Sequence, residues 1–86
     1  MNNEYYDDHK AYGFYYLNNQ KHRVNGPAGI WKDGHKEWWI HGQLHREDGP
    51  AIECRDGTKY WYLHGKMVEC NSQEEFERLI KLKSFW

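Results

Sequence analysis

The sequence predicts a mainly β fold: an antiparallel meander sheet of about two and a half 23-residue hairpin repeats, with one C-terminal α-helix packed on it. Three observations lead to this fold class. Residues 22–44 and 45–67 align without a gap and are identical at 11 of 23 positions. Each unit carries several Gly-containing turn signals with short aromatic runs between them. One amphipathic stretch, at residues 73–83, follows the repeats.

The chain of 86 residues is expected to form a single domain with three parts. Residues 1–10 are polar and acidic and predict a solvated N-terminal arm, although Tyr5 and Tyr6 could dock onto the sheet. Residues 11–70 are expected to form the repeat sheet. Residues 71–86 are expected to form the helix and a short tail.

Turn signals separate the expected strands. Asp33-Gly34 and Asp56-Gly57 predict two-residue hairpin turns, because Gly tolerates a positive φ and Asp bonds its own backbone. His41-Gly42 and His64-Gly65 predict second turns of the same kind. Asn18-Asn19 holds the matching place in a degenerate half-unit that caps the sheet.

A third bend is predicted in each unit at Asn25-Gly26-Pro27 and Asp48-Gly49-Pro50, because Pro disfavours a helical conformation of the preceding residue. We call it the Gly-Pro bend. No segment between the turns is long enough for a crossover helix, so the strands should pair as an antiparallel meander. The expected strands are residues 12–17, 28–32, 36–40, 51–55 and 59–63, with shorter pairing segments near residues 43–45 and 66–68.

Alternation along the strands assigns the two faces of the sheet. A Trp or Tyr followed two residues later by an aliphatic residue recurs in every unit, and this set is assigned to the core. Its members are Tyr15, Leu17, Trp38, Ile40, Trp61 and Leu63. The opposite face is aromatic but more varied. It carries Phe14, Tyr16, Glu37, Trp39, Tyr60 and Tyr62.

A helix should run from about residue 73 to residue 83. Ser72 and Glu75 form a capping box at its start, and the helix should lie across one face of the sheet and close the core. The residues expected to face the sheet are Phe76, Leu79, Ile80 and Lys83. Phe85 and Trp86 are then free either to tuck against the sheet or to project from it.

Composition restricts the classes of function. Lys and Arg number 12 and Asp and Glu number 13, so the net charge of −1 gives no strong signal for nucleic acid or anionic lipid. No apolar run approaches the ~18 residues of a membrane helix, so no membrane association is expected. The polar start is unlike a secretory signal. We therefore expect a cytoplasmic protein with Cys54 and Cys70 reduced, and a disulfide between them is the minor alternative.

The histidines and arginines of the repeat are candidates for metal or anion binding as well as for structural roles. His41, His45 and His64 could bind zinc with Cys54 or Cys70, but they lie beside turns at equivalent places, which favours structural hydrogen bonding and no metal. Arg23 and Arg46 also stand at equivalent places. Their guanidinium groups are expected to bond the carbonyls of the Gly-Pro bend or to pair with Asp48, with anion recognition as the alternative.

Aromatic residues make up 17% of the chain, which is enough for both a thin core and an exposed surface. Trp39, Tyr60, Tyr62 and Tyr16 could form a platform that stacks on bases or packs against a protein, or the helix could simply cover them. Cys54 near a His is a conceivable nucleophile. Its place on a strand inside a repeat favours a small core residue instead, and we expect no enzyme and no cofactor.

The strings HREDGPAIECRDGTKYWYLHGKMVE and HRVNGPAGIWKDGHKEWWIHGQL resemble a repeat family found in small proteins of tailed phages and large DNA viruses. Its members repeat a W-Y-L-N-G-K-x-H-R-x-D-G-P-A type motif and often end in a short helix after an S-x-E-E-F segment, here residues 72–76. The resemblance covers roughly residues 14–80 and extends more distantly to MORN-type hairpin repeats and bacterial antitoxins built from them. Where the family often has Asn-Gly, this chain has His41-Gly42 and His64-Gly65. The resemblance implies a non-catalytic viral module that binds and disables a host or defence factor.

The leading hypothesis is therefore an accessory protein that inhibits a host factor, such as an antiviral defence complex, by protein–protein contact. The residues expected to bind the partner are Trp39, Tyr60, Tyr62, Arg46 and Glu37. One alternative is a nucleotide or small-molecule binder that uses an aromatic and Arg-lined pocket. Another is an antitoxin-like or structural repeat. The open sheet edges also leave room for a homodimer.

Overall fold

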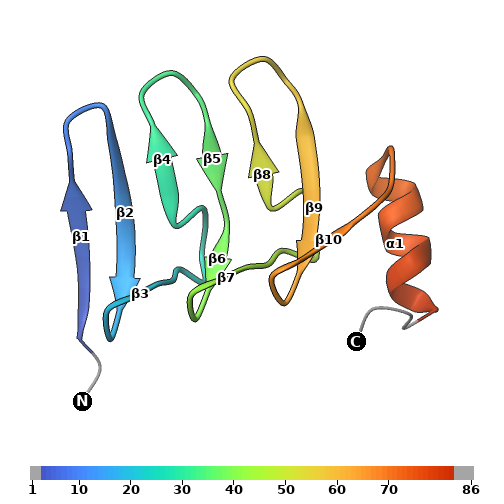
Figure 1. Cartoon of the computed structure of the whole chain (residues 1–86), viewed down its shortest axis with the longest axis horizontal. Coiled ribbons are helices and arrows are strands. Elements are labelled where there is room, and N and C mark those ends of the chain that lie inside the picture. Colours follow the sequence, from blue (N-terminus) through green and yellow to red (C-terminus); the bar gives the residue numbers. More distant parts are fainter. Residues whose placement is uncertain (1–2, 83–86) are drawn as a thin grey trace.

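The computed structural model describes residues 3–82 and confirms the mainly β fold with one C-terminal helix. Hairpins follow one another in a row from the N-terminal end, and the helix stands beside the last hairpin (Figure 1). The elements are β1 (Glu4–Asp8), β2 (Tyr12–Leu17), β3 (Gln20–Lys21), β4 (Gly29–Trp31), β5 (Lys36–Glu37), β6 (Trp39–Ile40), β7 (Gln43–Leu44), β8 (Ile52–Glu53), β9 (Lys59–Leu63), β10 (Lys66–Val68) and α1 (Gln73–Lys81).

All strand pairs are antiparallel, and the main order is β1-β2-β4-β5-β8-β9-β10. β3 pairs with the end of β2, and β6 pairs with β7. Neighbouring strands in this order are consecutive in sequence, except that β3 lies between β2 and β4 and that β6 and β7 lie between β5 and β8. This order is the meander that the sequence predicts.

One residue in the N-terminal half-unit, Tyr15, and its equivalent in residues 22–44, Trp38, each bond to two different strands. The N–H of Tyr15 donates to the carbonyl of Ala28 at 2.7 Å, and the carbonyl of Tyr15 accepts from His22 N–H at 3.0 Å. Trp38 repeats this arrangement 23 residues later, with Ala51 at 2.8 Å and His45 at 3.1 Å. The first half of the strand therefore pairs with the strand after the Gly-Pro bend, and the second half pairs with its own hairpin partner.

The turns at Asn18-Asn19, His41-Gly42 and His64-Gly65 are confirmed as two-residue hairpin turns with positive φ at both residues. The prediction of the same turn at Asp33-Gly34 and Asp56-Gly57 is wrong. Only the Gly of each pair has a positive φ, and the loops contain three residues, because the paired residues are Trp31 with His35 and Cys54 with Thr58.

Residues 4–8 do not form a free arm. They pair with β2 over the full length of β1. Tyr5 stacks on Tyr16, and the Tyr6 ring contacts the Tyr15 ring at a tilt of 51°. Four of the five β1 residues are exposed, so this strand is solvated as the polar sequence suggests, but it is part of the sheet. Aromatic cross-strand pairs supply the stabilisation that the polar residues do not.

The expected core is only partly correct. Trp61 and Leu63 are buried, whereas the equivalent residues of the earlier units are half-buried. Phe14, expected on the open face, is instead only 7% exposed. Gly29 lies directly opposite Phe14 and leaves space that the Phe14 ring fills, since a Cβ on Gly29 would lie 2.5 Å from Phe14 Cε1. The buried side chains are Phe14, Ala28, Ala51, Trp61, Leu63, Val68 and Phe76.

The helix is capped as predicted and covers one unit of the sheet. Ser72 Oγ accepts from Glu75 N–H at 3.1 Å, and Glu75 reaches back to Asn71 N–H at 2.8 Å. Phe76 packs with the core residues of β9 and β10, with Leu79 and Ile80 against the same cluster. The helix therefore closes the last unit only, and it ends at Lys81. The expectations for Lys83, Phe85 and Trp86 lie outside the described residues.

Candidate functional site

The strand register places one set of residues on the sheet face opposite the helix. Cross-strand partners share a face, and the pairs run from Phe14 to Gly29, then to Glu37, Ile52 and Tyr60. The helix packs on Trp61, which points to the other side. Within residues 3–82, no helix or additional layer packs over the face that carries Tyr60.

We call this surface the aromatic face, and it contains four of the five residues predicted to bind a partner. Its members by register and alternation include Tyr5, Asp7, Tyr12, Phe14, Tyr16, Lys21, Trp31, His35, Glu37, Trp39, Leu44, Ile52, Tyr60, Tyr62 and Met67. Four of these are large exposed side chains: Tyr5, Tyr12, Tyr60 and Met67. An exposed apolar set of this kind on one face is typical of an interaction surface.

The Glu37 carboxylate is held in place at the centre of the aromatic face. Trp39 Nε1–H donates to Glu37 Oε1 at 2.9 Å, and the His35 ring lies 3.0 Å from Glu37 Oε2. The Glu37 side chain is 18% exposed. These two contacts fix the carboxylate in one orientation while leaving acceptor positions on both oxygens.

Lys21 joins the first two units across the aromatic face. Its Nζ lies 4.2 Å from the Phe14 ring centroid and 4.6 Å from that of Trp39. Tyr12 stacks on Trp31 at 5.5 Å, and Trp31 meets Phe14 edge-on at 5.2 Å. Tyr12, Phe14 and Trp31 therefore form a cluster of rings that contact one another at this end of the aromatic face.

Arg46, the fifth residue predicted to bind a partner, does not belong to the aromatic face. Its guanidinium stacks on Trp38, bonds the Pro50 carbonyl at 3.1 Å and reaches Asp48 and Glu53, each at 3.0 Å. These contacts confirm the structural role expected for this arginine. A guanidinium with so many partners inside the chain has little freedom to bind another molecule.

Arg23 takes the same place in the preceding unit. It stacks on Tyr15 at 4.1 Å and donates to the Pro27 carbonyl at 3.2 Å. The residues equivalent to Asp48 and Glu53 are Asn25 and Ile30, so the two carboxylates that hold Arg46 have no counterpart here.

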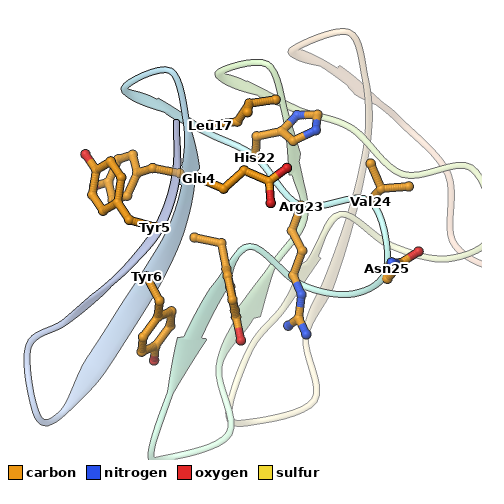
Figure 2. A pocket seen from close by; sticks show the side chains of 10 residues that line it. Glu4, Tyr5, Tyr6, Leu17, His22, Arg23, Val24 and Asn25 are labelled. Carbon is orange, nitrogen blue, oxygen red and sulfur yellow. The ribbon is translucent and has the colours of Figure 1, made fainter. Parts of the chain in front are cut away.

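A pocket of about 470 Å³ opens beside Arg23. Figure 2 shows Tyr5 and Tyr6 toward one side of it and Arg23 toward the other, with the Glu4 side chain extending from β1 toward His22 and Arg23. Its lining residues are Glu4, Tyr5, Tyr6, Tyr15, Tyr16, Leu17, His22, Arg23, Val24 and Asn25. The volume lies within the range of small-molecule sites.

The histidines at the repeat junctions form two matching pairs. His41 N–H donates to His22 Nδ1 and His64 N–H donates to His45 Nδ1, both at 2.9 Å. The rings of each pair lie 4.3 and 4.5 Å apart. Structural hydrogen bonding is thus what these residues do. Across residues 3–82, no group of three or more His, Cys, Asp or Glu residues is placed to hold a metal ion.

Both cysteines are free thiols. Burial raises the pKa of Cys54, and the neighbouring Asp56 and Glu37 carboxylates raise it further. Burial and then Glu75 raise the pKa of Cys70. A thiolate is the nucleophilic form, so these environments oppose the reactivity that the nucleophile alternative for Cys54 requires.

Sequence reasoning missed several members of the aromatic face, among them Tyr12, Trp31, His35 and Met67. Trp31 alternates with Gly29 along β4, so the period of two would have placed it opposite Tyr12 once the register was known. His35 lies between the predicted Asp33-Gly34 turn and the predicted strand from residue 36, so no role was predicted for it. Its contact with Glu37 depends on the three-residue loop, because this loop pairs His35 with Trp31 and aims its ring along the strand.

Compared with known protein families, curated proteins and solved structures, the chain shows no significant match to any of them. Among the residues that the structure describes, no helix is both long and apolar enough to cross a membrane.

Proposed function

We propose that the chain is a non-catalytic binding module that presents its aromatic face to a protein partner and blocks that partner's activity. The observation that carries this proposal is the position of α1. The helix packs on the Trp61 side of the sheet, so residues 3–82 leave the opposite side with its rings open to solvent. Aromatic side chains give large contact areas at a low cost in conformational entropy.

The chemistry of the aromatic face indicates the kind of surface that it fits. Tyr60 and Met67 offer exposed apolar area, and Glu37 offers a fixed carboxylate between rings. A partner with a basic side chain surrounded by apolar groups would match this arrangement. The resemblance to small viral repeat proteins makes a host factor, such as an antiviral defence complex, the partner that we propose.

The test uses the tagged full chain to capture proteins from a host-cell lysate. Tyr60→Ser combined with Met67→Ser removes two exposed side chains of the aromatic face without opening the core. The matched control, Val24→Ser combined with Leu82→Ser, removes two exposed apolar side chains elsewhere.

We expect a stoichiometric partner that binds the wild type and the control but is lost, or weakened about tenfold or more, with the aromatic-face variant. Recombinant partner should then lose its activity when wild-type chain is added. Absence of a stoichiometric partner, or equal capture by both variants, would contradict the proposal.

A further inference from the structure

Two arginines occupy equivalent places in the repeat, but among residues 3–82 carboxylates pair with Arg46 and not with Arg23. Arg46 Nε donates to Asp48 at 3.0 Å and Arg46 Nη1 lies 3.0 Å from Glu53. Arg23 forms no ion pair with any carboxylate among residues 3–82 within 4.0 Å, although it keeps the stacking contact and the bond to the bend carbonyl.

The environment of Arg46, in residues 45–67, therefore shows how an anion can bind to the arginine of this repeat. Two carboxylates approach the free edges of the guanidinium while its face rests on a ring. In the preceding repeat, residues 22–44, the places of Asp48 and Glu53 are taken by the uncharged residues Asn25 and Ile30. Arg23 is half-buried, so part of its hydration is already removed and a charge-assisted bond there is stronger than on an open surface.

The pocket beside Arg23 gives space for the rest of a ligand. Four of its ten lining residues are tyrosines. The ring centroids of Tyr6 and Tyr15 lie 4.6 Å apart at an interplanar angle of 51°, and the Arg23 guanidinium lies 4.1 Å from the Tyr15 centroid. Aromatic walls of this kind favour a planar ligand.

We infer that this pocket binds a small planar molecule that carries one carboxylate or phosphate group, with the oxyanion on Arg23 and the ring against Tyr6 and Tyr15. The Glu4 side chain extends toward Arg23 (Figure 2), and its negative charge opposes the binding of an anion at this arginine. The site lies on the opposite side of the sheet from most of the aromatic face. It does not depend on the protein-binding function proposed above.

The experiment follows ligand titrations of the full chain by NMR, through backbone amides and the Arg23 side chain. The probes are 4-hydroxyphenylacetate and adenosine 5′-monophosphate, with inorganic phosphate and adenosine as the separate halves of the second probe. We expect at least one planar probe to bind in the submillimolar range with shifts centred on Tyr6, Tyr15 and Arg23. Each half alone should bind more weakly.

One variant fills the site from within without removing Arg23. Asn25→Asp combined with Ile30→Glu gives Arg23 the two carboxylates that pair with Arg46 in the next repeat. These carboxylates should compete with the probe and weaken its binding about tenfold or more while the fold is kept. Glu4→Gln, in contrast, should strengthen binding. The inference is overturned if neither planar probe binds, if the shifts map elsewhere, or if the double variant binds as well as the wild type.

Discussion

The guanidinium carbon of Arg46 lies 3.8 Å from the centroid of the Trp38 ring. This contact shows what covers the aromatic residue of a strand where the helix does not pack on the sheet. In the first two units, an arginine from the following unit covers the aromatic residue of the strand, whereas in the last unit Phe76 of α1 packs near Trp61 instead. The arginine of the His-Arg pair therefore packs on the aromatic ring while its bond to the Pro carbonyl of the Gly-Pro bend holds it there.

Arg46→Lys should lower the free energy of unfolding by about 1–3 kcal/mol, measured by urea denaturation. A lysine keeps the charge but loses the planar stack on Trp38 and the fork that reaches Pro50 and Glu53 together. The matched control is Arg55→Lys, which changes an exposed side chain and should stay within about 0.5 kcal/mol. Equal effects of the two substitutions would show that the stack contributes nothing.

Gly49→Ala should destabilise the chain more than Gly26→Ala. A Cβ at Gly49 would lie 2.5 Å from Arg46 Cζ, whereas a Cβ at Gly26 would lie 3.3 Å from Arg23 Nη1. The first change must displace a guanidinium that is held by two carboxylates and a ring. We expect about 1–3 kcal/mol for Gly49→Ala. In an Arg46→Ala background this loss should largely disappear, and a double-mutant cycle that finds the two effects additive would contradict the explanation.

His22 should make stability fall as the pH falls. Burial lowers its pKa, the neighbouring His41 lowers it further, and Glu4 opposes both. Its Nδ1 accepts from His41 N–H, and a protonated ring cannot accept that bond. The unfolded chain therefore binds a proton at the ordinary value of about 6.5, before the folded chain does, so stability is full above this pH and is lost below it.

The measurement is the free energy of unfolding at several pH values between 5 and 8, for wild type and His22→Asn. Asparagine places an oxygen acceptor near the position of Nδ1 and does not titrate. Other histidines, such as His9 beside Asp7, are the same in both proteins, so the difference between the two curves isolates His22. Parallel curves for the two proteins would rule out this role for His22.

Phe76→Ala should cost about 3–5 kcal/mol, because the side chain is fully buried against Trp61, Leu63 and Val68. A small domain has a total stability of about 5–15 kcal/mol, so the loss should release the helix and expose Trp61. Tryptophan fluorescence and thermal denaturation would report both effects. Glu74→Ala, on the exposed side of the same helix, should cost less than about 1 kcal/mol.

The sequence predicted the fold because the repeat supplies the same information twice. Trp38 and Trp61 mark equivalent strand positions, and the turns between them leave only an antiparallel order. The helix was predictable from Ser72 and Glu75, whose side chains were expected to cap it and do so. Local chemistry of this kind needs no knowledge of distant contacts.

Features that depend on register could not be predicted in the same way. The burial of Phe14 follows from Gly29 lying opposite it, and the pairing of β1 with β2 is supported by two cross-strand tyrosine pairs that the polar sequence does not indicate. The stack of Arg46 on Trp38 could not be predicted for the same reason. Its position depends on the path of the Gly-Pro bend, which folds the side chain back over Trp38.

The double pairing of Tyr15 and of Trp38 also determines how such a chain can change in length. Each strand is divided between two partners, so an insertion of any size other than a whole unit would pull one half out of alignment with the other. A duplication of 23 residues keeps both halves in phase and leaves the two end elements, β1 and α1, where they are needed. The area offered to another molecule therefore grows in fixed steps, one unit at a time.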